Sequence, residues 1–187
     1  NSMITKSIKI IFLNLLLISS LFANTLEEDI KPLSKSSFKS KQSTIENIVD
    51  KYSEDPKLTV ILNNMLEGNL YFTKYKKQFV ILDKQEGKLF HTTDIFTSKS
   101  LEVTKKNMFK KVKTNNKLRS FIRNKLAELN LFSKDKKIRL TSVKNMLKNV
   151  DEDSKFLIDK ALKVEKDDDV IDVLIEADTI LKALYGT

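Results

Sequence analysis

The chain has 187 residues, of which 41% are hydrophobic and 32% charged, and this suits one compact domain or a short array of repeats. Three Gly, two Pro and no Cys disfavour a turn-rich β-sandwich and exclude disulfides, zinc–thiolate sites, iron–sulfur clusters and Cys nucleophiles. The single histidine, His91, excludes metal sites with several His ligands. The net charge of +9 comes mostly from Lys interspersed with Asp and Glu, and only three basic residues are Arg. We therefore interpret these charged residues as an ordinary solvated surface and predict no nucleic-acid partner.

Residues 1–23 have the pattern of a secretory signal peptide. Lys6 and Lys9 form a positive start, an apolar run follows, and Ala23 precedes the expected cleavage point. The alternative, an uncleaved membrane anchor, needs roughly 20 apolar residues, whereas this run is shorter and is interrupted by Asn14. We expect a chain that is secreted across the inner membrane and is periplasmic, or lies at the periplasmic face of that membrane.

The next two segments predict the start of a helical protein. Residues 24–41 are rich in Ser and Lys and predict a polar linker or a short helix. Residues 42–68 predict a first helix pair, because apolar residues recur on one face of each helix. Ser43 is the candidate N-cap of the first helix in this pair.

The second helix of the pair has signals at both ends. Asp55 is a typical N-cap, and Pro56 fits the first helical position, where its missing N–H costs nothing. Gly68 is expected to end the helix.

Residues 69–104 break the helical pattern. Their aromatic and β-branched runs, with a turn near Gly87, predict a small antiparallel β insert. His91 is interpreted as a half-exposed strand residue of this insert. Three aromatic side chains could bind a partner, or could instead pack the insert onto the helices: Tyr71, Phe72 and Tyr75.

Residues 105–187 predict helical repeats. Asp135 and Asp167 each precede an apolar helical face by three residues, and they are 32 residues apart. Helix pairs at such a spacing are typical of HEAT and armadillo proteins. We therefore predict a mostly α fold, a HEAT/armadillo-like α-solenoid of helix pairs with a small antiparallel β insert, whose surface binds a partner.

The start of the first of these helices allows two interpretations. Asn115 is a typical N-cap. Alternatively, Asn115 and Asn116 could form a polar partner-binding surface with Arg119. The three glycines are isolated, and the Asp167–Asp169 run lacks the alternation of a calcium loop, so we predict no cofactor, no metal site and no catalytic residues.

Three short motifs carry a resemblance to a known family. They are Gly68-Asn69-Leu70-Tyr71, the helix start Asn115-Asn116-Lys117-Leu118-Arg119, and the turn at residues 129–135. Together with the leader and the order of the parts, they resemble the N-terminal periplasmic, HEAT-like extension of the permease subunit of urea ABC transporters, a relative of the branched-chain amino-acid permeases. The resemblance covers residues 44–184. It implies a non-catalytic docking or assembly module whose partners are a periplasmic solute-binding protein and the membrane subunits.

In that family the extension precedes membrane-spanning helices, and no apolar run of that length follows here before Thr187. We expect either an excerpt of a longer permease, associated with the membrane through a missing C-terminal transmembrane part, or the product of a split gene. The main alternative is a freestanding secreted HEAT-like adaptor with an unrelated partner. An enzyme such as a hydrolase, with a pocket built around His91 or around an Asp/Glu pair, is the weakest hypothesis.

Overall fold

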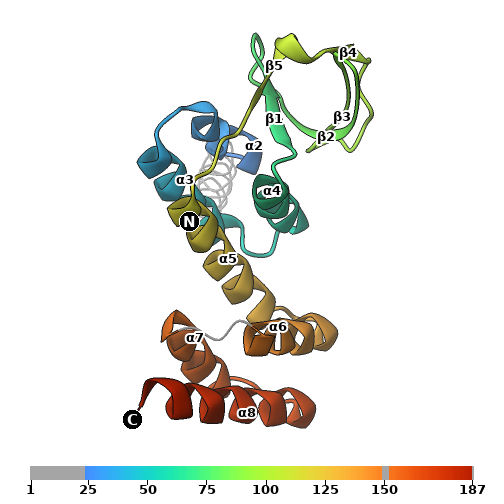
Figure 1. The fold of residues 1–187 in the computed structure, drawn as a ribbon. Helices are drawn as coiled ribbons and strands as arrows, with labels where there is room; N and C mark the ends of the chain where they lie inside the picture. The colour runs from blue at the N-terminus through green and yellow to red at the C-terminus, as the bar shows by residue number, and fades with distance from the viewer. Residues whose placement is uncertain (1–23, 149–151, 187) are drawn as a thin grey trace, which may run out of the picture.

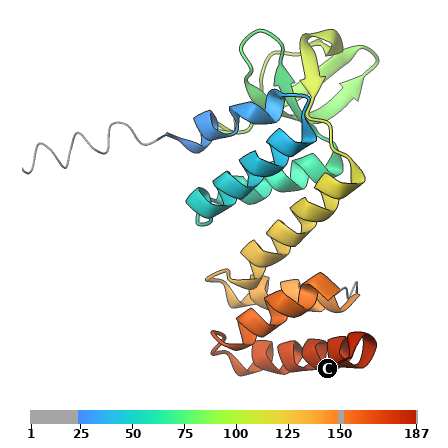
Figure 2. The ribbon, with the colours of Figure 1, turned by 90° about the vertical axis from the view of Figure 1, so that its left-hand side faces the viewer.

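The computed structural model describes residues 24–148 and 152–186, so the predicted signal peptide lies outside the described residues. The molecule is elongated (Figures 1 and 2), with a β-sheet at one end, a first group of helices beside it and a second group at the other end. One long helix, α5, runs between the two groups. None of the described helices has the length and apolarity needed to span a bilayer.

The predicted fold class is wrong. The described residues form seven α-helices and a five-stranded antiparallel sheet, 60% helix and 15% strand, which is a mixed fold and not a helical solenoid with a small insert. The prediction failed because two strands beyond the aromatic runs, β4 (Thr104–Lys105) and β5 (Phe109–Lys111), are rich in Lys. Backbone pairing with β3 and β1 holds these two strands in the sheet. Neither strand has the alternation of hydrophobic and polar residues by which a strand is predicted from sequence.

Residues 24–41, predicted as a polar linker or a short helix, are mostly helical in the structure. Helix α2 (Leu26–Asp29) and the 3-10 helix η2 (Lys31–Ser34) bury Leu26, Ile30 and Leu33 in the first core. Helix α3 (Phe38–Tyr52) starts after Ser37, whose hydroxyl accepts the backbone N–H of Ser40. The predicted cap at Ser43 is therefore wrong, because the hydroxyl of Ser43 donates to the carbonyl of Lys39 within the helix.

Helix α4 (Pro56–Glu67) has the ends that the sequence predicts. The carboxylate of Asp55 accepts the N–H of Lys57 at 2.9 Å, and Pro56 is the first helical residue. Gly68 closes the helix with a φ of 76°, a left-handed conformation that favours glycine.

The sheet follows directly from α4. Its other strands are β1 (Leu70–Thr73), β2 (Phe79–Glu86) and β3 (Leu89–Asp94), and the strand order is β4-β3-β2-β1-β5. It curls around a core of its own, made of Val80, Phe90 and Phe109. The Phe90 and Phe109 rings stack with centroids 5.5 Å apart. The 3-10 helix η3 (Lys106–Met108) joins β4 to β5.

Helix α5 (Asn116–Leu131) belongs to both helical cores. Leu118, Ile122 and Leu126 lie in the first core, and Leu131 lies in the second. The second core is completed by α6 (Lys136–Lys148), α7 (Glu152–Leu162) and α8 (Asp168–Tyr185). Because it packs at both ends, α5 fixes the place where the two helix groups meet.

Candidate functional site

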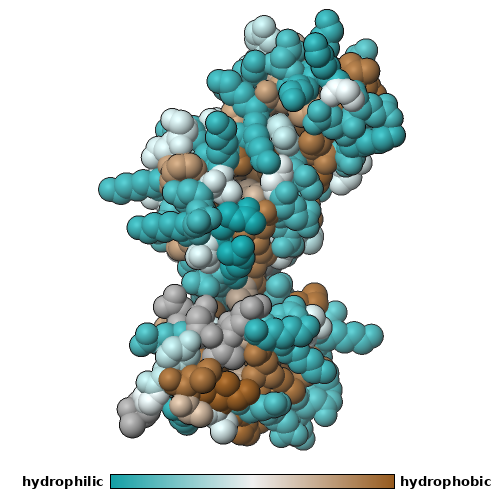
Figure 3. Space-filling view, viewed as in Figure 1, coloured by the Kyte–Doolittle hydropathy of each residue, from teal (hydrophilic) through white to brown (hydrophobic). Residues whose placement is uncertain are grey.

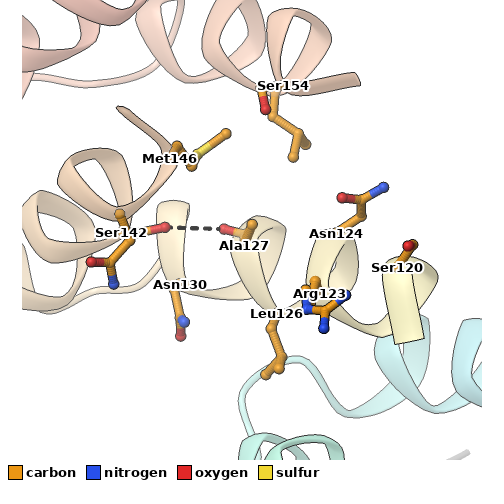
Figure 4. Close-up of a pocket in the computed structure, with 11 residues that line it drawn as sticks. Ser120, Arg123, Asn124, Leu126, Ala127, Asn130, Ser142, Met146 and Ser154 are labelled. Atoms are coloured by element: carbon orange, nitrogen blue, oxygen red, sulfur yellow. Dashed lines mark hydrogen bonds between the residues drawn. The ribbon is translucent and has the colours of Figure 1, made fainter. Parts of the chain in front are cut away.

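A pocket of about 460 Å³ lies where α5 meets α6 and α7 (Figure 4). Helix α5 supplies more than half of its lining, and α6 and α7 close the other side. The lining residues are Ser120, Arg123, Asn124, Leu126, Ala127, Asn130, Ser142, Asn145, Met146, Ser154 and Leu157.

The apolar part of this pocket is built into the protein core. Leu126, Met146 and Leu157 are buried, and they belong to α5, α6 and α7 respectively. The hydroxyl of Ser142 donates to the carbonyl of Ala127 at 3.4 Å, which links α6 to α5 at the pocket wall. The walls are therefore parts of packed helices, and such walls hold a pocket in one shape.

The polar part of the pocket consists mainly of carboxamides. Within the described part of the chain, Asn124, Asn130 and Asn145 make no side-chain hydrogen bond inside the protein, so their donors and acceptors face solvent or a ligand. Figure 4 shows Asn124 pointing from α5 toward the side of the pocket below Ser154. Among the described residues of the lining, Arg123 is the only charged one. The pocket can therefore hold a polar chain by hydrogen bonds and can pair with a carboxylate.

The aromatic residues singled out from the sequence lie far from this pocket, in or beside the sheet. Phe72 is only 3% exposed and packs on Phe79, so its ring is not on the surface. Tyr71 packs edge-on against Phe90 with centroids 5.2 Å apart, and burial raises the pKa of its hydroxyl. Tyr75, in the turn between β1 and β2, is 83% exposed and remains accessible to a partner.

The polar residues singled out at the start of α5 have structural contacts. Asn115 is the predicted N-cap, and its side chain accepts the N–H of Leu118 at 2.8 Å. Arg119 donates to the carbonyl of Leu66 at 2.6 Å, where it stabilises the C-terminal end of α4. Asn116 is exposed in the first turn of α5. The structure does not bring these three residues together with the aromatic residues, and none of the three lines the pocket.

The sequence did contain a signal for the pocket. Ser120, Asn124 and Ala127 recur at i, i+4 and i+7, a stripe of small and polar residues beside the apolar stripe of α5. A search for apolar periodicity passes over such a stripe. The contributions of α6 and α7 depend on how the helices cross, which the sequence pattern does not encode.

Across residues 24–148 and 152–186, no group of three or more His, Asp or Glu is arranged to hold a metal ion. Comparison with protein-family models, with curated proteins and with solved structures finds no match to this chain. The resemblance to the urea transporter extension thus stays a prediction from three short motifs.

Proposed function

We propose that the chain is a non-catalytic docking module that binds an extended segment of a partner protein in the pocket between α5, α6 and α7. The observation that carries this proposal is the pairing of a carboxamide-rich rim with a buried apolar floor in one pocket. Its volume of about 460 Å³ lies within the range of ordinary ligand sites.

The chemistry of the rim fits a peptide main chain. An extended peptide presents N–H and C=O groups in turn, and a carboxamide can donate to one and accept from the other. The side chains of Asn124, Asn130 and Asn145 supply three such groups, contributed by α5 and α6. The apolar floor can take a side chain of the peptide, and Arg123 can pair with a carboxylate of the peptide.

The resemblance gives the proposed partners, and it does so by analogy alone. They are the periplasmic solute-binding protein and the membrane subunits of a urea-type ABC importer, so the module would act in the periplasm or at the periplasmic face of the inner membrane. The HEAT-like architecture that the resemblance implied is not part of this proposal.

The test is affinity purification of the tagged full chain from the source cells. We would compare the wild type with N124A/N145A and with the matched control N47A/N63A, which removes two exposed carboxamides from α3 and α4. Losing two hydrogen bonds of about 1 kcal/mol each should weaken binding about thirtyfold in the pocket variant, while the control should bind like the wild type.

The identity of the retained protein distinguishes the hypotheses. Importer subunits, retained by the wild type and lost with N124A/N145A, would support the whole proposal. An unrelated secreted partner lost in the same way would support docking in the pocket and would replace the importer with a freestanding adaptor. Equal recovery by all three chains would contradict the pocket as the docking site.

A further inference from the structure

The positive charge of the protein is concentrated in the sheet. Residues 70–113 contain eleven Lys, four Asp or Glu and no Arg, a net +7, so all other residues together carry only +2 of the total of +9. Such a concentration of like charge is unfavourable within the sheet unless something outside compensates it.

Much of this charge lies in three loops at the end of the sheet that points away from the helices. The backbone N–H of Lys74 donates to the carbonyl of Met108 at 2.9 Å, which holds the β1–β2 turn beside η3. The N–H of Lys106 donates to the carbonyl of Lys88 at 2.8 Å, which brings in the β2–β3 turn. We call the exposed residues of these loops the basic rim: Lys74, Tyr75, Lys76, Lys77, Lys88, Leu89, Lys105, Lys106 and Met108.

Among the described residues, the charges of the basic rim have no acidic partner. Within the described residues none of its lysines forms an ion pair, and the nearby carboxylate of Glu86 is held by Lys84 and His91 instead. Lys77 is the one rim lysine with an aromatic contact, 5.0 Å from the centre of the Phe72 ring. The remaining rim lysines are thus available to an external anion.

Exposed apolar side chains lie among these lysines. Tyr75 has a lysine on either side of it in the turn, and Met108 at the end of η3 and Leu89 at the start of β3 are also exposed. Figure 3 shows this end of the molecule as mostly hydrophilic, with a small hydrophobic area beside β4. Lysines around a few exposed apolar side chains suit the interface of an anionic bilayer, where the charges meet phosphates and the apolar groups enter the headgroup layer.

We propose that the basic rim docks the protein on an anionic lipid bilayer. The absence of Arg from residues 70–113 favours lipid over nucleic acid, because Arg supplies the bidentate contacts to bases and phosphodiesters whereas Lys acts as a point charge. The exposed apolar groups also favour lipid, because the phosphate backbone of a nucleic acid offers them no apolar layer. This inference goes beyond the proposed docking pocket and does not depend on it.

The test uses the full chain and vesicles of phosphatidylcholine, with or without phosphatidylglycerol. K74Q/K76Q/K106Q removes three rim charges and leaves Lys77 in place. K117Q/K144Q/K163Q is the control with the same net charge, because it removes three exposed lysines from the helical region. The apolar N-terminal residues are common to all chains, and their contribution is measured on phosphatidylcholine alone.

Each lysine close to an anionic surface strengthens binding about fivefold, so the rim variant should bind phosphatidylglycerol vesicles about a hundredfold more weakly than the wild type. The control should stay within about threefold of the wild type, since distant exposed charges are screened. Equal weakening of the two triple variants would overturn the proposal, because it would mean that only net charge matters.

A second measurement reports where the rim lies. The protein contains no Trp, so Y75W introduces a single tryptophan into the rim. Its emission should shift to the blue with phosphatidylglycerol vesicles and stay unchanged with phosphatidylcholine. An unshifted emission would overturn insertion of the rim. Tighter binding to duplex DNA with the same lysine dependence, or displacement from vesicles by soluble glycerol phosphate, would overturn the choice of a bilayer.

Discussion

Arg139 and Glu165 are joined at two points, with 2.8 Å between Nε and Oε2 and 3.2 Å between Nη2 and Oε1. Their side chains are only 18% and 7% exposed. The guanidinium also donates to the carbonyl of Ser133 at 2.8 Å, and the carboxylate accepts the N–H of Asp167 at 3.0 Å. One ion pair thus connects α6 with the loop before it and with the loop that leads into α8.

Removing one member of this pair should destabilise the second helix group. E165Q leaves the largely buried Arg139 without a counter-charge, and losing one partner of such a pair costs about 3 kcal/mol at the buried limit. For a chain of this length we expect Tm to fall by roughly 10 °C in a thermal melt followed by circular dichroism. The exposed pair between Lys134 and Glu54 is the control, and E54Q should leave Tm unchanged.

The same carboxylate should make stability depend on pH. Burial alone raises the pKa of Glu165, but hydrogen bonds from Arg139 and from the N–H groups of Asp167 and Lys166 outweigh it and hold the pKa below its usual 4.5. The contribution of the ionised Glu165 to the free energy of unfolding is fully present above pH 4.5. It is lost as the pH falls through the lower pKa of the folded state, because the unfolded chain binds the proton first. Urea unfolding should show a shallower loss of stability below pH 4.5 in E165Q than in the wild type. Identical slopes would contradict this assignment.

Lys41 should have the opposite dependence on pH. It is 2% exposed, and its ammonium donates to the carbonyl of Lys113 at 2.7 Å, with no carboxylate partner among the described residues. Burial, and then the charge of Lys113, lower the pKa of Lys41 below 10.5. Stability should therefore rise as the pH increases through the folded-state pKa toward 10.5, since the folded protein releases its proton first. K41M should lack this rise in urea titrations above pH 8, whereas the exposed-site control K39M should retain it.

Gly68 should tolerate no side chain without loss of stability. Its φ of 76° strains any other residue, and a Cβ there would lie 2.7 Å from Nζ of Lys111. G68A should cost about 1 kcal/mol or more in urea unfolding. Gly87 has a φ of 57° and open space around it, so G87A tests the backbone strain alone. If adding K111A restores part of the stability lost in G68A, the contact with Lys111 contributes to that loss. If adding K111A restores none of it, backbone strain accounts for the whole loss.

The features that the sequence predicts well are local ones. The sequence predicts helix starts at Asp55, Asn115 and Asp167, and each of these residues caps a helix through its own side chain. A cap depends on the two or three residues that follow it, so the pattern is visible in the chain.

The features that were missed depend on distant parts of the chain. Lys110 and Lys111 gave no strand signal, yet they pair with Phe72 and Tyr71 to complete the sheet. In the same way, Asn124 and Asn145 line one pocket only because α5 and α6 pack together there. Neither arrangement has a local sequence signature, and both decide what the surface can bind.

The most direct test of the central claim is photo-crosslinking from within the pocket in living cells. A photoreactive amino acid would replace Ser120, an exposed residue of the pocket lining, and in a separate chain it would replace Asn63 on the exposed face of α4. Docking in the pocket predicts one crosslinked protein partner from position 120, lost when N124A/N145A is added, and none from position 63. The same crosslinks from both positions, or none from position 120, would contradict docking in the pocket.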